Sequence, residues 1–156
     1  MPLTKQYNEI LTLAAAITEG VPNNVSNLSN VSAILFENLK DVNWAGFYIA
    51  GEQNGEEWLF LGPFQGRPAC TSIKRGKGVC GTAMAERRSV VVENVLEFPG
   101  HIACDERSRS EIVVPVFRGD ELFGVMDVDS GKFGRFGEDD REGLEALAEL
   151  VGRILL

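Results

Sequence analysis

Residues 44–62 read WAGFYIAGEQNGEEWLFLG, and this stretch decides the fold class. Strand-like runs with a period of two lie on both sides of Asn54-Gly55, a dipeptide that favours tight hairpin turns. The same pattern returns in EIVVPVF (111–117) and ELFGVMDVD (121–129), which flank Gly119-Asp120. Each pair predicts two antiparallel strands. Neighbouring hairpins of this kind favour one antiparallel sheet with helices packed against it, an α+β fold.

Predicted helices precede and follow the strands in the sequence. Apolar residues recur every three or four positions over residues 3–17 and again over residues 25–39, where Asn23 or Asn24 suits the N-cap. A third helix, acidic in its first turn, is predicted over residues 138–156. We therefore expect two N-terminal helices and one C-terminal helix around the sheet.

The middle of the chain is less regular. Residues 62–78 are rich in Gly, Pro and basic residues and predict a loop region with a short strand near Cys70 to Ile73. A short helix over 78–88 and a strand over 89–95 follow. Residues 96–110 have no sustained period, and long irregular segments in compact domains often carry function.

The amino-acid composition indicates which classes of protein this chain can belong to. The 156 residues contain 44% hydrophobic and 24% charged side chains, which is typical of one globular domain. The formal net charge of −8 disfavours binding to phosphate backbones or anionic lipid surfaces. The sequence has neither a recognisable targeting segment nor an apolar run long enough to span a membrane. We therefore expect a cytoplasmic protein.

Three cysteines, Cys70, Cys80 and Cys104, lie in one central segment. In a reducing compartment an odd number of cysteines argues against a permanent disulfide framework. The thiols are then buried, metal-bound or redox-active. Zinc is disfavoured, because the spacing of these cysteines and of His101 is unlike that of structural zinc sites.

Clustered carboxylates follow the cysteines. Asp127 and Asp129 are two residues apart on one predicted strand, so they point to the same face. A strict two-residue turn at Gly119-Asp120 would put Glu111 on the other face. A bulge at the turn or at Pro115 would instead place Glu111 opposite Asp129. We predict such a bulge and an acidic pocket, in which repulsion raises at least one carboxyl pKa.

Four segments together resemble a known family. They are NWAGFYI (43–49), GKGVCGTA (76–83), HIACDERSRSEIVVPV (101–116) and LFGVMDVDS (122–130). The sequence is similar to the free methionine-(R)-sulfoxide reductases, enzymes built on a GAF domain. The likeness covers nearly the whole chain and implies a single GAF domain over residues 1–156, with an antiparallel sheet of about six strands.

The resemblance implies a thiol mechanism. A thiolate attacks the sulfoxide sulfur while an acid polarises or protonates the oxygen, and a second thiol converts the resulting sulfenic acid to a disulfide. The resemblance assigns the attack to Cys104 and its resolution to Cys70, with Cys80 as an auxiliary or alternative thiol. It also implies that Glu111 and Asp129 polarise the sulfoxide.

The resemblance also implies which residues bind the substrate and which partners the protein has. The resemblance has Asp127 hold the substrate's amino group and places Trp44 and Tyr48 in the pocket, with Trp44 over the methyl end. It implies no bound cofactor, electrons from thioredoxin (from NADPH through thioredoxin reductase), and thus thioredoxin as a partner. The N-terminal helices could also support a homodimer.

The local sequence alone favours a different nucleophile, Cys80. Cys80 follows Lys74, Arg75 and Lys77 and opens a predicted helix, and both features should lower a thiol pKa. We still follow the resemblance, because a thiol with a lower pKa is also an intrinsically weaker nucleophile.

Other interpretations stay open at this point. Cys80, Trp44 and Tyr48 could be ordinary core residues, and the acids a solvated face. The whole chain could also be a non-catalytic GAF sensor for a small ligand or redox state, because one fold serves many functions.

Overall fold

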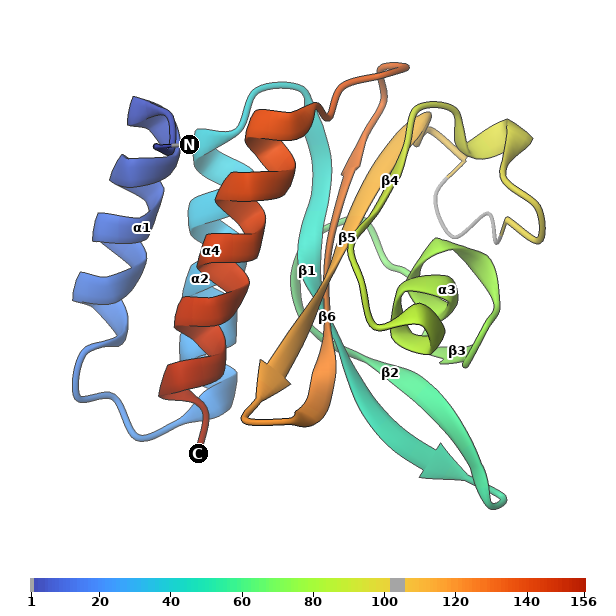
Figure 1. Cartoon of the computed structure of the whole chain (residues 1–156), viewed down its shortest axis with the longest axis horizontal. Coiled ribbons are helices and arrows are strands. Elements are labelled where there is room, and N and C mark those ends of the chain that lie inside the picture. Colours follow the sequence, from blue (N-terminus) through green and yellow to red (C-terminus); the bar gives the residue numbers. More distant parts are fainter. Residues whose placement is uncertain (1, 102–105) are drawn as a thin grey trace.

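The computed structural model describes residues 2–101 and 106–156, in which a six-stranded antiparallel sheet is covered by helices on both faces (Figure 1). The helices are α1 (Lys5–Thr18), α2 (Asn24–Asn38), α3 (Gly78–Glu86) and α4 (Glu138–Ile154). The strands are β1 (Val42–Gln53), β2 (Glu56–Gly66), β3 (Ser72–Lys74), β4 (Val90–Val92), β5 (Ser110–Arg118) and β6 (Glu121–Ser130). Their order in the sheet is β3-β2-β1-β6-β5-β4. The predicted α+β class, with two N-terminal helices and one C-terminal helix, is confirmed.

The helices begin where side chains can cap them. Thr4 accepts a hydrogen bond from the backbone N–H of Tyr7, and Asn23 accepts one from the N–H of Ser26. Of the two N-cap candidates for α2, Asn23 is therefore the cap. Such caps satisfy backbone donors that have no partner inside the helix.

Helices α2 and α4 pack on one face of the sheet, and α1 packs against both of them on the side away from the sheet (Figure 1). We call this face of the sheet the helical face. Every second residue of the central strands points into its core, including Phe47, Ile112, Met126 and Val128. This alternation follows from the period-two geometry of a strand.

A buried polar contact joins α1 to α4 within this core. The hydroxyl of Tyr7 donates a 2.7 Å hydrogen bond to Asp140 Oδ1, and Arg135 forms an ion pair with the same carboxylate. The ring of Tyr7 lies against Gly143, where an added Cβ would come within 2.2 Å of it. A glycine at 143 is therefore required for α1 to approach α4 this closely.

The first hairpin is longer than predicted. We expected a loop from residue 62 onward, but β2 continues to Gly66. The pairing with β1 shifts between Gly46 and Tyr48, so that Gly62 and Pro63 together lie opposite Phe47. This bulge accommodates Pro63, which has no N–H to donate to a ladder.

The other irregular segments also differ from the predictions. β3 begins at Ser72 rather than near Cys70, and β4 spans only Val90–Val92 because Asn94 caps a short 3-10 helix over Val95–Glu97. Cys104, the predicted nucleophile, lies outside the described residues.

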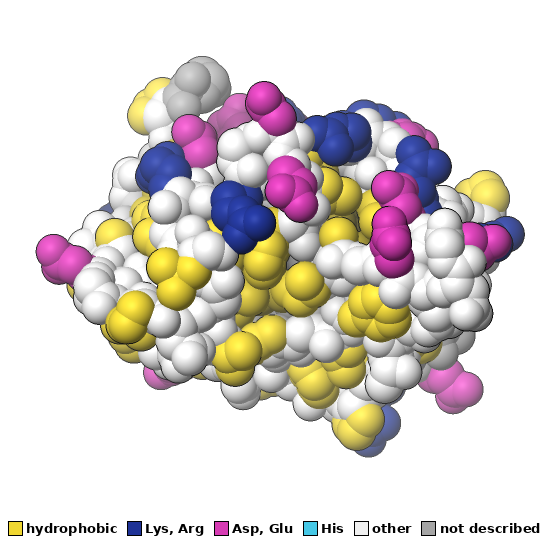
Figure 2. Space-filling view, turned by 90° about the horizontal axis from the view of Figure 1, so that it is seen from below, with side chains coloured by type: hydrophobic (Ala, Val, Ile, Leu, Met, Phe, Trp, Pro, Cys, Tyr) yellow, Lys and Arg dark blue, Asp and Glu magenta, His cyan; other side chains and the backbone are white. Residues whose placement is uncertain are grey.

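The face of the molecule seen from below carries charges of both signs (Figure 2). In the view from below, Lys and Arg side chains are interspersed with Asp and Glu, and no continuous basic stripe crosses this face (Figure 2). Across the described residues, every helix is too short or too polar to span a bilayer.

Candidate active site

The second face of the sheet carries the predicted acids, and we call it the pocket face. α3 packs over it against β5 and β6. The strand pairing places Trp44 of β1, Asp129 of β6 and Glu111 of β5 in one row across the sheet. Asp127 lies in the next row, opposite Gly46.

A bulge sets this register, as predicted. Next to the turn Arg118 opposes Glu121, but the pairing shifts between Val116 and Phe117, and Phe123 has no opposite residue. Beyond that point Glu111 opposes Asp129. Of the two predicted positions, the one near the turn is confirmed and the one at Pro115 is excluded, because Pro115 pairs with Val125 in continuous register.

Pro115 fits there because β4 pairs only with residues 111–113 of β5. The sheet edge is open beside Pro115, and an edge position tolerates a residue without an N–H. The extra residue of the bulge is Phe123. The one-residue shift that it introduces puts Glu111 on the same face of the sheet as Asp129.

An aromatic wall stands beside the acids. The ring of Trp44 stacks against both Tyr48 and Phe64, with ring centroids 5.8 and 5.1 Å away. Phe64 can come this close because Gly46 has no side chain, and an added Cβ there would lie 2.3 Å from the Cβ of Phe64. Trp44 and Tyr48 are each only 2% exposed.

Both aromatic residues also hold the neighbouring loop by hydrogen bonds. Trp44 Nε1 donates to the carbonyl of Arg67 at 3.1 Å, and the Tyr48 hydroxyl donates to the carbonyl of Cys70 at 3.1 Å. Burial, and then the charge of Asp127, raise the pKa of Tyr48 above its ordinary value, so the hydroxyl stays a donor. These two residues thus position the backbone that carries Cys70.

The acids surround the thiol of Cys80. Cys80 Sγ lies 3.8 Å from Glu111 Oε2. Cys80, Glu111 and Asp127 are 4%, 9% and 5% exposed. Asp127 Oδ1 is buried and has no hydrogen-bond partner among the described residues. An unpaired buried carboxylate oxygen is costly unless a ligand satisfies it.

The crowding of acids changes their protonation. Burial raises the pKa of Asp127 well above its usual range, and the negative charges of Asp129 and Glu111 raise it further. The prediction that repulsion would raise at least one carboxyl pKa is confirmed by Asp127. The protonated form of Asp127 therefore persists to a higher pH than that of an ordinary aspartate.

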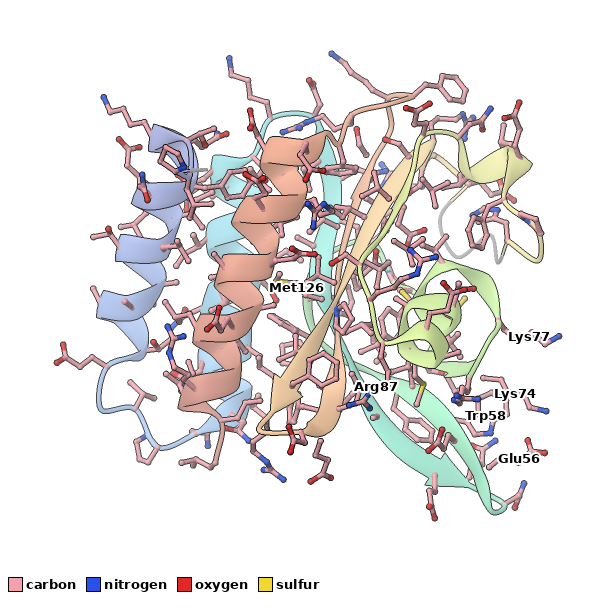
Figure 3. The ribbon with its side chains drawn as sticks, viewed as in Figure 1. Glu56, Trp58, Lys74, Lys77, Arg87 and Met126 are labelled. Atoms are coloured by element: carbon pink, nitrogen blue, oxygen red, sulfur yellow. The ribbon has the colours of Figure 1, made fainter. Side chains whose placement is uncertain are left out.

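The expected low pKa of Cys80 was wrong. Burial raises the pKa of this thiol, and the charges of Asp127 and Glu111 add to the effect. The basic residues that precede it do not face it: Lys74 and Lys77 point outward in Figure 3, and Lys74 pairs with Glu56 at 3.1 Å. Arg75 likewise pairs with Glu57. Helix position and sequence neighbours could not reveal these long-range acids.

A small cavity lies at the centre of these groups. Its volume is about 50 Å³. It is lined by the predicted residues Trp44, Tyr48, Cys80, Glu111, Asp127 and Asp129, together with His101, Lys77 and Ser108. A cavity of this size is large enough for at least one ordered water molecule.

Sequence reasoning did not choose Ser108 as a site residue. It is 8% exposed and accepts a hydrogen bond from Asn43 Nδ2 at 3.4 Å. It belongs to the irregular stretch before β5, where no period indicates which side chains point inward. Only its place in a segment already expected to be functional could have drawn attention to it.

Comparison with known proteins decides the family. Residues 25–155 match the family described as the GAF domain. The chain belongs to the GAF family. A protein from Escherichia coli named free methionine-R-sulfoxide reductase is 43% identical to it over 99% of this chain and 92% of its own length.

Solved GAF structures agree closely with this one. The free methionine-R-sulfoxide reductase of Staphylococcus aureus, solved in complex with substrate, is 47% identical and has a TM-score of 0.89 over 100% of this chain and 98% of its own. A Burkholderia vietnamiensis structure described as a GAF sensor protein is 45% identical, with a TM-score of 0.90 over 97% of this chain and 94% of its own.

The described cysteines of this GAF domain are in different states. Cys70 is disulfide-bonded, whereas Cys80 is a free, buried thiol. Cys80 is therefore not the partner of Cys70. The two thiols that could resolve a sulfenic acid are thus distinguished by their bonding.

Proposed function

We propose that this protein reduces free L-methionine-(R)-sulfoxide to methionine. One observation carries the proposal: Trp44, Glu111, Asp127 and Asp129 converge on one cavity in a chain 43–47% identical to reductases of that name over nearly its full length. A cavity with an aromatic wall and convergent acids suits a ligand that has an apolar methyl end and an ammonium group.

The acids would have separate roles in substrate binding and in catalysis. Asp127 pairs with the substrate ammonium, which would satisfy its unpartnered Oδ1. Glu111 and Asp129, opposite one another in the sheet, polarise the sulfoxide oxygen. Because the crowding of acids favours protonation of a carboxyl group, a proton would be available to that oxygen as the S–O bond breaks.

The sulfur chemistry follows in two steps. The Cys104 thiolate attacks the sulfoxide sulfur, the oxygen passes to Cys104 as a sulfenic acid, and methionine leaves. The Cys70 thiol then attacks that sulfenic acid, which forms a disulfide and releases water. The disulfide-bonded state of Cys70 and the raised pKa of Cys80 support Cys70 as the resolving thiol and Cys80 as an auxiliary one.

An external dithiol must then restore the enzyme. Thioredoxin, reduced by NADPH through thioredoxin reductase, would reduce the disulfide, and the protein itself would need no bound cofactor. Exposed apolar residues on α1 and α2, such as Ile17 and Val25, are compatible with the predicted homodimer.

The test is NADPH oxidation in the presence of thioredoxin and thioredoxin reductase. Free methionine-(R)-sulfoxide, its S epimer and a peptide-bound sulfoxide are compared. We expect turnover with the free R epimer only, lost in Cys104→Ser and reduced in Cys70→Ser. Binding of substrate without turnover, in fully reduced protein, would favour a GAF sensor instead. Measuring methionine formation with dithiothreitol as the reductant separates failure of the enzyme from failure of thioredoxin as its donor.

A further inference from the structure

Three potential metal ligands from three different elements meet in the pocket. The thiol of Cys80 comes from α3, and the carboxylates of Glu111 and Asp127 come from β5 and β6. Their ligand atoms all lie within 4.8 Å of one another. All three residues are buried, so this is not a chance cluster of surface acids.

The spacing suits tetrahedral coordination. With bonds of about 2.3 Å to sulfur and about 2.1 Å to oxygen, tetrahedral zinc holds a sulfur and an oxygen about 3.6 Å apart. Cys80 Sγ and Glu111 Oε2 are 3.8 Å apart without an ion between them. Small side-chain rotations would therefore complete the geometry.

A second feature points to a ligand at this position. Asp127 is 95% buried, since its exposed fraction is 5%, and its Oδ1 has no partner among the described residues. A cation can satisfy that oxygen, in competition with a proton shared between Asp127 and the carboxyl groups of Glu111 and Asp129. The adjoining cavity of about 50 Å³ has room for an ion and a water, and His101 lines it as a further possible ligand.

We propose that Cys80, Glu111 and Asp127 form an inhibitory site for Zn²⁺, with His101 or water as the fourth ligand. The inhibitory part rests on the proposed function. On binding, the Cys80 thiol releases its proton to solvent as the S–Zn bond forms, and no electron is transferred. The ion is not a cofactor of the reduction.

The donor set selects the type of metal. Mg²⁺ and Ca²⁺ prefer six or more oxygen ligands and would gain little from a thiolate. One sulfur, two carboxylates and a possible imidazole suit Zn²⁺ and its spectroscopic substitute Co²⁺.

The position explains why the ion would inhibit. Zn²⁺ bound to Asp127 and Glu111 occupies the carboxylates assigned to the substrate ammonium and the sulfoxide oxygen. It also fills the small cavity that the substrate must enter. Zn²⁺ and free methionine sulfoxide should therefore exclude one another.

The test begins with direct binding, independent of turnover. Reduced wild-type protein, kept in a phosphine reductant, is titrated with Co²⁺, and we expect a thiolate-to-cobalt charge-transfer band that Zn²⁺ abolishes. Cys80→Ser should lose the band. Glu111→Gln, which keeps the side-chain shape, should weaken Zn²⁺ binding at least about 100-fold in competition with a chromogenic chelator.

Matched controls locate the site. Asp129→Asn removes a neighbouring acid outside the three ligands, and Cys70→Ser removes a different thiol, so both should keep the Co²⁺ band. Circular dichroism checks that each variant is folded. Absence of the band in wild type, or its persistence in folded Cys80→Ser, would overturn the site.

Turnover assays then address inhibition separately. We expect Zn²⁺ to raise KM for the sulfoxide in wild type. A Co²⁺ band without any turnover would refute the proposed reductase while leaving the metal site intact. Turnover that is insensitive to Zn²⁺ at concentrations that saturate the site would refute inhibition.

Discussion

The two faces of the same sheet differ in how well their polar groups are satisfied. On the helical face, Met126 and Val128 pack into an apolar core, as Figure 3 shows for Met126 beneath α4, and the buried Asp140 has both Tyr7 and Arg135 as partners. On the pocket face, Asp127 is buried with an unpartnered oxygen. The helical face can hold the fold together while the pocket face keeps groups that favour a ligand over stability.

The largest effect should come from an acid of the pocket face. Glu111→Gln keeps the side-chain shape but removes the charge opposite Asp129. We expect kcat/KM for free methionine-(R)-sulfoxide to fall by roughly 10²–10⁴-fold, with little loss of stability. Glu121→Gln, on the exposed turn end of β6, is the control and should retain turnover. Glu111→Gln activity within about threefold of wild type would contradict the role assigned to this acid.

Substitutions on the helical face should lower stability and leave turnover largely unchanged. Leu147→Ala removes a fully buried side chain and should lower the free energy of unfolding in urea by about 2–5 kcal/mol. Turnover per folded molecule should persist. Leu13→Ala, at 48% exposure, should cost much less. Equal losses from the two variants would show that burial of Leu147 in the core of the helical face adds no more stability than an exposed leucine.

The two tyrosines provide one matched pair across the sheet. Each is 2% exposed and donates a hydrogen bond, Tyr7 to Asp140 on the helical face and Tyr48 to the Cys70 carbonyl on the pocket face. Tyr7→Phe leaves a buried carboxylate oxygen without its donor and should cost about 1–3 kcal/mol of stability with little change in turnover.

Tyr48→Phe should give the complementary result. It releases the loop that carries Cys70, so turnover should fall while the free energy of unfolding changes less than in Tyr7→Phe. Chemical denaturation and steady-state kinetics of both variants provide the comparison. A reversal of the two patterns would reject the division of labour between the faces.

The smallest expected effect is a pH dependence. Because the pKa of Asp127 is raised in the folded protein, the folded state binds more protons than the unfolded chain. Its contribution to stability is therefore lost as the pH rises from about 4, near the unfolded pKa, through the higher folded pKa.

Asp127→Asn removes this titration, so the variant should gain stability relative to wild type as the pH rises from about 4 through the higher folded pKa. Urea unfolding at several pH values measures the difference. Asp120→Asn, at the exposed tip of the β5–β6 hairpin, should show no such trend. A constant difference between Asp127→Asn and wild type would mean that Asp127 is ionised throughout.

Much of the site could be predicted from local pattern. Trp44 and Tyr48 share a face because they are four residues apart on a strand, and Asp127 and Asp129 share a face for the same reason. The position of the bulge could not be predicted, because any one-residue offset in the hairpin has the same effect on distant pairs. Phe123, which takes that role, has no distinguishing feature in the sequence.

The sequence by itself determined the helices, the alternation of the strands and the two-residue spacing that separates Asp127 and Asp129 from Met126 and Val128. These are short-range properties of the backbone. Only the tertiary structure decided that Glu111 lies opposite Asp129 and that burial among acids raises the pKa of Cys80. Register and desolvation depend on residues far apart in the chain, so no local pattern encodes them.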